Sequence, residues 1–450
     1  MADLFAILFT PGDDIARAES WMLAPGRQVS AAAGDDLITG VVSGDPSQSS
    51  DYSGCSLINQ GGLFAGDGKD RIVLDESSIS LYGGQILFSY ASHRPSLVNH
   101  ALIDLGSNDD QLVVSNQADG GNRQSLGAVN DGRILAGSGR DYLSFAGYIG
   151  LLNKGSVETG SDADHLSASG FTNVSIDSIA PVVGRAGLWN EGRVDFGDGR
   201  DVLRCTGLGS GLVNSGFVGL GADADVVDAS GYGHGLCNSG VLSLGAGVDS
   251  IHAQSGGPSY SRINGSAIKT GPALVNLGLI DAGSDDDLIE FSSTSGLSLL
   301  NRGAIRMGTG NDVLRNVSPA PYDSIFSPQG ARPVKNLGVI LMGPGDDLVD
   351  SLISPGSPGG LPDPGFVGRG LIDMGSGNDT FRGFGDGHIC GGDGLDTLIL
   401  PIGTYAITPL PGERFRLGAR MTVSGFERFG EGADRVSFAA AIVAGSVTFS

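Results

Sequence analysis

The sequence predicts an all-β protein, a β-solenoid of about twelve coils with glycine-rich turns. Three observations lead to this fold class: glycine supplies 76 of the 450 residues, one turn motif recurs along the chain, and apolar residues stand at fixed offsets from it. The glycines lack the Gly-X-Y period of collagen, and 40% apolar residues is too many for a disordered chain. Recurrence of one unit at short intervals is the sequence signature of a repeat fold.

Each copy of the repeat contains a glycine four residues before an aspartate, which we call the anchor glycine and the turn aspartate. Residues 370–381, GLIDMGSGNDTF, form one copy, with Gly375 as the anchor and Asp379 as the turn aspartate. The twelve anchors are Gly66, Gly106, Gly137, Gly160, Gly197, Gly221, Gly245, Gly283, Gly308, Gly343, Gly375 and Gly392. The twelve turn aspartates are Asp70, Asp110, Asp141, Asp164, Asp201, Asp225, Asp249, Asp287, Asp312, Asp347, Asp379 and Asp396.

Other positions of the repeat are nearly as regular. The residues three before and six after the anchor are apolar in every copy, and ten copies have asparagine seven residues before it. Two residues after the anchor stand eight glycines, Asn108, Asp162, Asp223 and Asp285. Glycine, asparagine and aspartate are the residues that best tolerate a positive φ. A tight turn with a left-handed residue is therefore predicted at this position.

The spacing of the anchors predicts the size of one coil. The closest anchors are 23 to 25 residues apart, and short segments of alternating apolar and polar residues separate the turns. Such alternation between glycine turns is typical of strands. We expect three strands and three corners in each coil, with a buried core that includes Ile305, Leu314, Ile340, Val349 and Ile372.

The longer spacings imply insertions at a single corner, between the strand after the turn aspartate and the next Leu-x-Asn strand. Pro319–Pro333 and Pro355–Pro364 are expected to be exposed because prolines cannot join a β-ladder. The predicted division is an N-terminal cap with degenerate repeats at 1–56, the repeat solenoid at 57–400, and a C-terminal cap with a secretion signal at 401–450. Weak copies are expected at Val29–Ile38 and Phe429–Val436.

The asparagine and aspartate columns differ in their chemistry. Stacked asparagines can form a ladder in which each side-chain amide bonds the next, and we expect this column to be structural. Stacked aspartates about 4.8 Å apart repel one another by about 1 kcal/mol in water and by several at a protein surface. Two explanations remain open: each aspartate caps the backbone of its own turn, or divalent cations lie between the coils. Calcium suits the second, because it takes carboxylate and carbonyl oxygens together.

The candidate calcium ligands are turn aspartates and the acidic or amide residues beside them. The turn aspartates are Asp70, Asp110, Asp141, Asp201, Asp287, Asp312, Asp347, Asp379 and Asp396. The neighbours are Asp285, Asp286, Asn311, Asp346, Asn378 and Asp393. Because these extra oxygens belong to the copies from Gly283 onward, the stronger sites are expected there.

Four turns resemble the RTX, or haemolysin-type, calcium-binding repeat: GSGND at Gly375, GTGND at Gly308, GPGDD at Gly343 and GGDGLDTLIL at Gly391. That family's motif is Gly-Gly-x-Gly-x-Asp-x-U-x, with U apolar. The resemblance implies that Ca²⁺ binds at the turns and stabilises the fold, and that the chain leaves a bacterial cell by type I secretion with an uncleaved C-terminal signal. One turn per 23 to 25 residues, in place of the family's nine, implies a broader coil with one ion-binding edge.

The composition narrows the functional classes. A net charge of −23 argues against nucleic acids and anionic membranes as partners, and no apolar run approaches the ~20 residues of a transmembrane helix. We recognise no catalytic constellation, so no enzyme is expected. The sequence favours a secreted or cell-surface calcium-binding protein. The alternatives are an adhesin or surface-layer protein with purely structural turns, whose loop edge binds a cell-surface or polysaccharide partner, and a carbohydrate-active β-helix enzyme.

Overall fold

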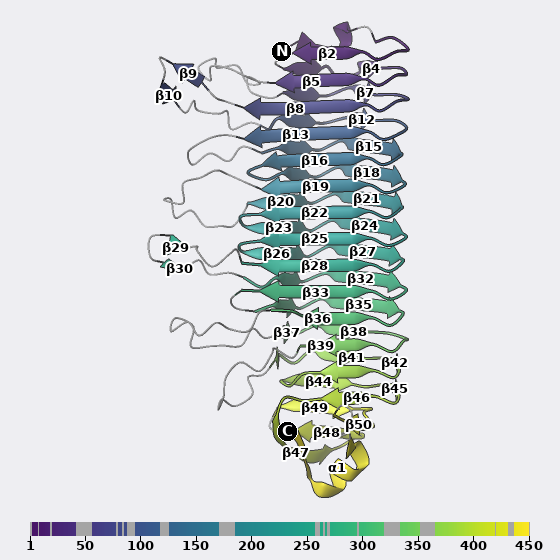
Figure 1. Ribbon diagram of the computed structural model, residues 1–450, viewed down its shortest axis with the longest axis vertical. Coiled ribbons are helices and arrows are strands. Elements are labelled where there is room, and N and C mark those ends of the chain that lie inside the picture. Colours follow the sequence, from purple (N-terminus) through teal and green to yellow (C-terminus); the bar gives the residue numbers. More distant parts are fainter. Residues whose placement is uncertain are drawn as a thin grey trace. The chain divides into compact units, whose positions relative to one another are not determined.

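The computed structural model describes residues 2–7, 9–18, 20–41, 56–77, 80–82, 85–87, 95–117, 126–170, 185–256, 262–263, 266–267, 271–294, 297–318, 334–351, 365–418, 420–430 and 436–449. It divides into two compact units: Met1–Tyr232 with Tyr260–Ile268, and Gly233–Ser259 with Lys269–Ser450. Each unit is a stack of parallel strands, so the predicted all-β solenoid is confirmed (Figure 1). The predicted boundaries at 56/57 and 400/401 stay predictions.

Most coils contain three strands, as the spacing of the anchors predicted, whereas the coil of Gly392 has only an isolated bridge between Phe366 and Gly385 in place of the first. We call the sheets that they form sheet 1, whose strands mostly end at the asparagine, sheet 2, whose strands lead into the anchor glycine, and sheet 3, whose strands follow the turn aspartate. In the coil of Gly160 these strands are β17 (Leu151–Asn153), β18 (Ser156–Ser161) and β19 (His165–Gly170). Equivalent residues of successive coils pair in register, because the repeat is periodic.

The strands of the first unit belong to these three sheets. Sheet 1 contains β1 (Ala2–Asp3), β3 (Trp21–Leu23), β6 (Leu57–Asn59), β11 (Leu97–Asn99), β14 (Ala128–Asn130), β17, β20 (Ala186–Asn190) and β23 (Ser210–Asn214). Sheet 2 contains β4 (Gln28–Ser30), β7 (Gly62–Phe64), β12 (Leu102–Asp104), β15 (Arg133–Ser138), β18, β21 (Arg193–Asp198) and β24 (Phe217–Ala222). Sheet 3 contains β2 (Ile15–Ala18), β5 (Leu37–Val41), β8 (Arg71–Ser77), β13 (Gln111–Gln117), β16 (Tyr142–Gly147), β19, β22 (Val202–Gly207) and β25 (Val226–Gly231).

The second unit repeats the arrangement. Its sheet 1 contains β26 (His234–Asn238), β31 (Leu274–Asn276), β34 (Leu299–Asn301), β37 (Val334–Asn336) and β40 (Phe366–Val367). Its sheet 2 contains β27 (Val241–Ala246), β32 (Leu279–Ser284), β35 (Ala304–Thr309), β38 (Val339–Leu341), β41 (Leu371–Asp373), β44 (Gly387–Cys390) and β49 (Met421–Ser424). Its sheet 3 contains β28 (Ser250–Ser255), β33 (Leu288–Ser293), β36 (Val313–Asn316), β39 (Leu348–Asp350), β43 (Thr380–Arg382), β46 (Thr397–Ile399) and β50 (Arg428–Phe429).

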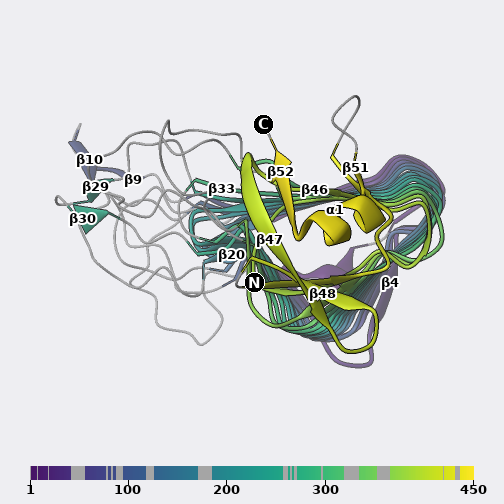
Figure 2. The same cartoon turned by 90° about the horizontal axis from the view of Figure 1, so that it is seen from below.

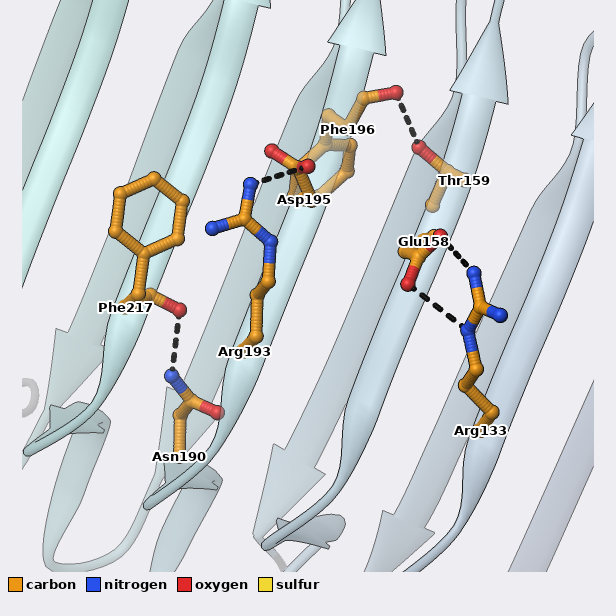
Figure 3. A network of polar contacts seen from close by, with 8 residues as sticks. All are labelled: Arg133, Glu158, Thr159, Asn190, Arg193, Asp195, Phe196 and Phe217. Carbon is orange, nitrogen blue, oxygen red and sulfur yellow. Dashed lines mark hydrogen bonds and ion pairs between the residues drawn. The ribbon is translucent and has the colours of Figure 1, made fainter. Parts of the chain in front are cut away.

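The apolar columns form the core of each unit. Buried and less buried residues alternate along β18 and β19, as period-2 side-chain geometry requires. The five residues predicted to be buried are at most 1% exposed: Ile305, Leu314, Ile340, Val349 and Ile372. The outward positions of sheet 2 carry charged pairs instead, where Arg133 bonds Glu158 across neighbouring strands at 2.7 and 3.1 Å (Figure 3).

The asparagine column forms the predicted amide ladder. The Asn153 side-chain amide donates to Oδ1 of Asn190 at 2.8 Å, and that of Asn190 donates to Oδ1 of Asn214 at 2.9 Å. The Asn190 amide also donates to the main-chain oxygen of Phe217, as Figure 3 shows. Because asparagine has both a donor and an acceptor, one side chain can serve two coils. All the asparagines of this ladder are buried.

Two hairpins lie in the chain between a strand of sheet 3 and the next strand of sheet 1. They are β9 (Ser80–Tyr82) with β10 (Gln85–Leu87), and β29 (Arg262–Ile263) with β30 (Ser266–Ala267). This is the connection in which the sequence predicted insertions. The insertions Pro319–Pro333 and Pro355–Pro364 lie outside the described residues.

The C-terminal end of the second unit is closed by a different structure. Antiparallel β47 (Gly403–Leu410), β48 (Arg414–Leu417) and β52 (Ser446–Phe449) stand with α1 (Phe438–Ala444) at this end (Figure 2). Short pairs complete the list of elements: β42 (Ser376–Gly377) with β45 (Asp393–Gly394), β50 with β51 (Val436–Ser437), and the 3-10 turn η1 (Leu4–Ala6) at the other end of the chain. No helix in the described ranges is long and apolar enough to cross a membrane.

The two weak copies had different outcomes. The copy at Val29–Ile38 is a true coil: β4 and β5 pair with β7 and β8, and Asp36 is buried like the other turn aspartates. The turn of the copy at Phe429–Val436, residues 431–435, lies outside the described residues. Phe429 pairs with Leu398, so the residue at the place of the turn aspartate in this coil is Glu427. Val436 pairs with Phe429 in antiparallel orientation, so these two residues do not belong to a further parallel coil.

Candidate metal site: the buried aspartate ladder

The turn that carries each aspartate requires glycine for two separate reasons. The anchors have φ between 92° and 113°, and the position two residues later is also left-handed in every copy, including Asn108, Asp162, Asp223 and Asp285. The predicted left-handed column is thus confirmed. A Cβ on any anchor from Gly106 to Gly221, or from Gly283 to Gly392, would lie 1.5 to 1.9 Å from the carbonyl oxygen of the preceding anchor. Glycine therefore allows the turns to stack at this distance.

The turn aspartates form a continuous ladder of hydrogen bonds within each unit. The main-chain N–H of one aspartate donates to Oδ1 of the aspartate one coil later, at 2.7 to 2.9 Å. In the first unit the order is Asp14, Asp36, Asp70, Asp110, Asp141, Asp164, Asp201 and Asp225. In the second unit it is Asp249, Asp287, Asp312, Asp347, Asp379 and Asp396, followed by Glu427.

The ladder confirms that Asp287, Asp312, Asp347 and Asp379 lie along one corner, despite spacings of 25, 35 and 32 residues. It also modifies one of the two explanations. The aspartate does cap a backbone N–H, but that N–H belongs to the preceding coil and not to its own turn. The acceptor thereby joins two coils, which a cap within one turn would not do.

The second carboxylate oxygen has no such partner. All the turn aspartates from Asp36 to Asp396 are at most 3% exposed. Within the described residues, Oδ2 is buried without a hydrogen bond in Asp36, Asp70, Asp110, Asp141, Asp164, Asp201, Asp287, Asp312, Asp347, Asp379 and Asp396. A buried carboxylate oxygen without a partner is costly unless a proton or a cation joins it.

Burial raises the pKa of the turn aspartates, which favours their protonated form. Desolvation raises the pKa of Asp110 and Asp287 to about 8, although the hydrogen bond from the preceding N–H opposes the shift. The same cause raises the pKa of Asp141, Asp201, Asp347 and Asp379 to about 7. It raises the pKa of Asp70, Asp164, Asp312 and Asp396 to about 6. Without a cation, part of the ladder is therefore protonated near neutral pH.

The remaining candidate ligands form a second column on the outside of the same turns. Asp285, Asp286, Asn311, Asp346, Asn378 and Asp393 are all exposed. Their side chains also link coils: the N–H of Asn311 donates to Asp286 at 2.6 Å, and that of Asp346 donates to Asn311 at 2.8 Å. The structure thus separates the candidate set into the buried turn aspartates and the exposed residues beside them. The sequence did not separate them, since both groups carry oxygen ligands and lie within three residues of each other.

In the coil of Gly392, the residue just before the anchor lies beside the second oxygen of the turn aspartate: a Cβ added to Gly391 would lie 2.8 Å from Oδ2 of Asp396. The hydroxyl of Thr159, at the equivalent position of its own coil, donates to the carbonyl oxygen of Phe196 at 3.0 Å. The other copies have a buried apolar residue at this position: Ala65, Leu105, Ala136, Phe196, Leu220, Leu244, Ala282, Met307, Met342 and Met374.

The donor set fits calcium better than it fits a metal held by side chains alone. No three His, Cys, Asp or Glu side chains in the described residues gather into a metal-binding cluster. A cation at the ladder would take one buried Oδ2 and complete its shell with turn carbonyl oxygens. Calcium accepts such a mixture of oxygens in flexible geometry.

Sequence reasoning missed two members of the ladder, Asp14 and Glu427. Asp36 belongs to the weak copy predicted at Val29–Ile38, whereas Asp14 precedes the first complete coil. Glu427 follows a shortened turn with a different acid. For Asp14 and Glu427 no motif was available, and the register of sheet 3 alone identifies them.

No protein-family model matches this chain, and no curated protein does. The resemblance to the RTX repeat therefore stays a resemblance. Among solved structures, the chain is similar to the crystal structure of a hyperactive, Ca²⁺-dependent, β-helical antifreeze protein from an Antarctic bacterium. The TM-score is 0.43 at 14% identity, over 95% of this chain and 93% of that one. A similarity of this size supports no argument about function. The functional argument rests on the aspartate ladder itself.

Proposed function

We propose that this protein is a calcium-binding solenoid in which Ca²⁺, held at the glycine–aspartate turns, stabilises the stacked coils. The observation that supports the proposal is the column of buried Oδ2 atoms without hydrogen bonds in the eleven turn aspartates named above. A cation between coils would neutralise these like charges and relieve the cost of burying them. The net charge of −23 points the same way, because an acidic chain attracts divalent cations.

A second candidate is a purely structural ladder, as expected of an adhesin or surface-layer protein. The specific observation in its favour is that Oδ1 of Asp312, Asp347 and Asp379, as in most other turns, already accepts a hydrogen bond from the preceding coil, which needs no metal. In this case the buried carboxyl groups hold protons and the turns are complete without calcium. The two candidates differ in what calcium does to stability.

The decisive experiment is a calcium titration of the full chain after treatment with a chelator. Binding is measured by calorimetry and thermal unfolding by circular dichroism, with magnesium as the control cation. The proposal requires saturable calcium binding and a rise in unfolding temperature with calcium concentration. The proposal fails if the titration gives no heat of binding and the unfolding temperature does not change with millimolar calcium. The turns would then be purely structural.

A position outside the cell, reached by type I secretion, is the part of the proposal that rests on the RTX resemblance. It implies that residues 401–450 direct export. Expression with and without this segment in a bacterium with a type I exporter tests it. Equal amounts of both chains in the medium would contradict this part.

A further inference from the structure

The coil that ends the ladder differs from every repeat before it. β49 pairs with β44 and β50 pairs with β46, which places Val423 opposite Ile389 and Phe429 opposite Leu398. Nine positions separate Ile389 from Leu398, but six separate Val423 from Phe429. The turn of this coil is therefore shorter, and the Gly-x-Gly-x-Asp motif is absent from it.

A longer acidic side chain takes the place of the missing aspartate. Oε2 of Glu427 accepts a hydrogen bond from the main-chain N–H of Asp396 at 2.8 Å, which is the bond that an aspartate makes elsewhere. Glutamate has one more methylene than aspartate, so its carboxylate reaches the ladder from a turn that has been cut short. Glu427 is partly exposed, in contrast to the turn aspartates.

The surroundings of Asp396 also differ from those of the other turn aspartates. Its Oδ2 has no hydrogen bond and Asp396 is 0% exposed. A Cβ on Gly391 would lie 2.8 Å from this oxygen and 2.1 Å from the carbonyl oxygen of Gly425, which is too close for a side chain. Both oxygens therefore lie against Gly391, whereas every other copy has a side chain at the equivalent position.

We propose that the C-terminal end of the ladder is a divalent-cation site of its own, formed by Oδ2 of Asp396, the carboxylate of Glu427 and the carbonyl of Gly425 beside Gly391. The inference rests on the proposed function for the choice of calcium as the ion. It assigns the tightest site to the end of the ladder, where a second acidic side chain, Glu427, and the carbonyl oxygen of Gly425 lie near Asp396. Since Glu427 and Gly425 follow β49, calcium here ties the C-terminal cap to the last repeat.

The test uses the full chain and calcium itself, with two variants that act in different ways. Glu427→Gln keeps an oxygen that accepts from the Asp396 N–H but removes the charge. Gly391→Ala places a methyl group against Oδ2 of Asp396 and the carbonyl oxygen of Gly425. Each should weaken the tightest calcium-binding phase in calorimetry by at least about tenfold in Kd. Glu413→Gln is the matched control, because it makes the same change at an exposed site of the same cap.

Hydrogen exchange supplies a second measurement that a merely structural role would not change. Calcium should slow exchange of the β49 and β50 amides in the unmodified chain, and Glu427→Gln should remove this effect while the calcium-free rates stay equal. If both variants keep the tightest phase while Asp312→Asn weakens binding, the terminal site is overturned and the repeat ladder stands. If only the terminal variants matter, the terminal site stands and the ladder does not bind calcium. No binding to the unmodified chain overturns both.

Discussion

The main-chain N–H of Asp312 donates to Oδ1 of Asp347 at 2.8 Å, although 35 residues separate them. The same bond recurs between neighbouring turn aspartates in both units, so each aspartate is at once the donor to one coil and the acceptor from another. One oxygen of every carboxyl is committed to this role. The other oxygen, buried and without a hydrogen bond in Asp312 and Asp347, is where a proton or a cation can act.

Asp347→Asn and Asp347→Ala should therefore have different effects. Asparagine keeps an oxygen for the Asp312 N–H, whereas alanine leaves that buried N–H without a partner, which costs about 1–3 kcal/mol. In calcium-free buffer, Asp347→Ala should lower the free energy of unfolding by this amount more than Asp347→Asn does. With calcium, both should lose affinity at the turns on either side of Asp347. Chemical denaturation and calorimetry measure the two quantities.

The exposed neighbour provides the control for this pair. Asp346→Asn changes the same charge one residue away, in the outer column. It should leave the calcium-free stability nearly unchanged, because Asn378 can still donate to an amide oxygen there. Equal losses for Asp347→Asn and Asp347→Ala would show that the hydrogen bond between coils contributes nothing.

The calcium-free protein should become less stable as pH rises from about 5 to about 8. Burial raises the pKa of Asp347 to about 7 and that of Asp287 to about 8, from 3.8 in the unfolded chain. Between these values the folded state binds more protons than the unfolded state, so the free energy of unfolding falls with increasing pH. Thermal unfolding in a chelator across this pH range measures the slope.

Calcium should reverse this dependence, because its ligands must be deprotonated. The unfolding temperature at about pH 8 should then rise with calcium more than it does at about pH 5, where protons compete. Asp287→Asn should flatten the calcium-free slope, since one titrating group is removed. A calcium-free stability that increases over this pH range would contradict the burial of ionisable carboxyl groups in the ladder.

Much of the fold could be predicted from the sequence, because every copy of the repeat has the same residue types at the same positions. The substitutions at Asn108, Asp162, Asp223 and Asp285 indicated a left-handed position, and all four have positive φ. The fixed offset of the apolar columns predicted the buried face, including Ile340. Both features depend only on residues within one copy, so each copy provides independent evidence for them.

The candidate site could be predicted only in part. The sequence placed the aspartates on one corner, but it could not show that Oδ1 of Asp347 reaches back to the coil of Asp312. That bond depends on how far each turn stacks from the next, which is a property of the assembled sheets. Glu427 was missed for a related reason, because a shorter turn with a longer side chain has no counterpart in the repeat.

The asparagine ladder should tolerate substitution far less well than the exposed residues beside it. Asn190 accepts from Asn153 and donates to Asn214 and to the main chain of Phe217. Asn190→Ala would leave buried partners in both neighbouring coils unpaired, at about 1–3 kcal/mol for each group. We expect a loss of at least about 2 kcal/mol in the free energy of unfolding, with calcium binding at distant turns unchanged.

Glu191→Ala is the matched control for this change. Glu191 is the next residue along the chain and is exposed at the same corner. Its removal should alter stability by no more than about 0.5 kcal/mol. A small effect of Asn190→Ala, comparable with that of Glu191→Ala, would mean that the ladder is not a main contributor to the stacking of coils.

Ala32→Gly should stabilise the protein. Ala32 occupies the anchor position of the first complete coil and has φ of 76°, whereas the twelve later anchors are all glycine. A residue with a Cβ costs about 1–2 kcal/mol in the left-handed region, and glycine avoids this cost. Because glycine also gains entropy in the unfolded chain, the expected net increase in the free energy of unfolding is about 0.5–1 kcal/mol. Chemical denaturation, followed through the unfolding transition of the first unit, measures this increase.

Ala101→Gly gives the opposite expectation and serves as the control. Ala101 stands two residues after Asn99, where the other copies have glycine, but it is not among the residues with positive φ. Glycine there relieves no strain and adds only flexibility to the unfolded chain, so stability should fall by about 0.5–1 kcal/mol. The sign of the two changes therefore depends on φ and not on agreement with the repeat. If both substitutions stabilised the protein alike, consensus with the other copies, rather than left-handed strain at Ala32, would be the cause.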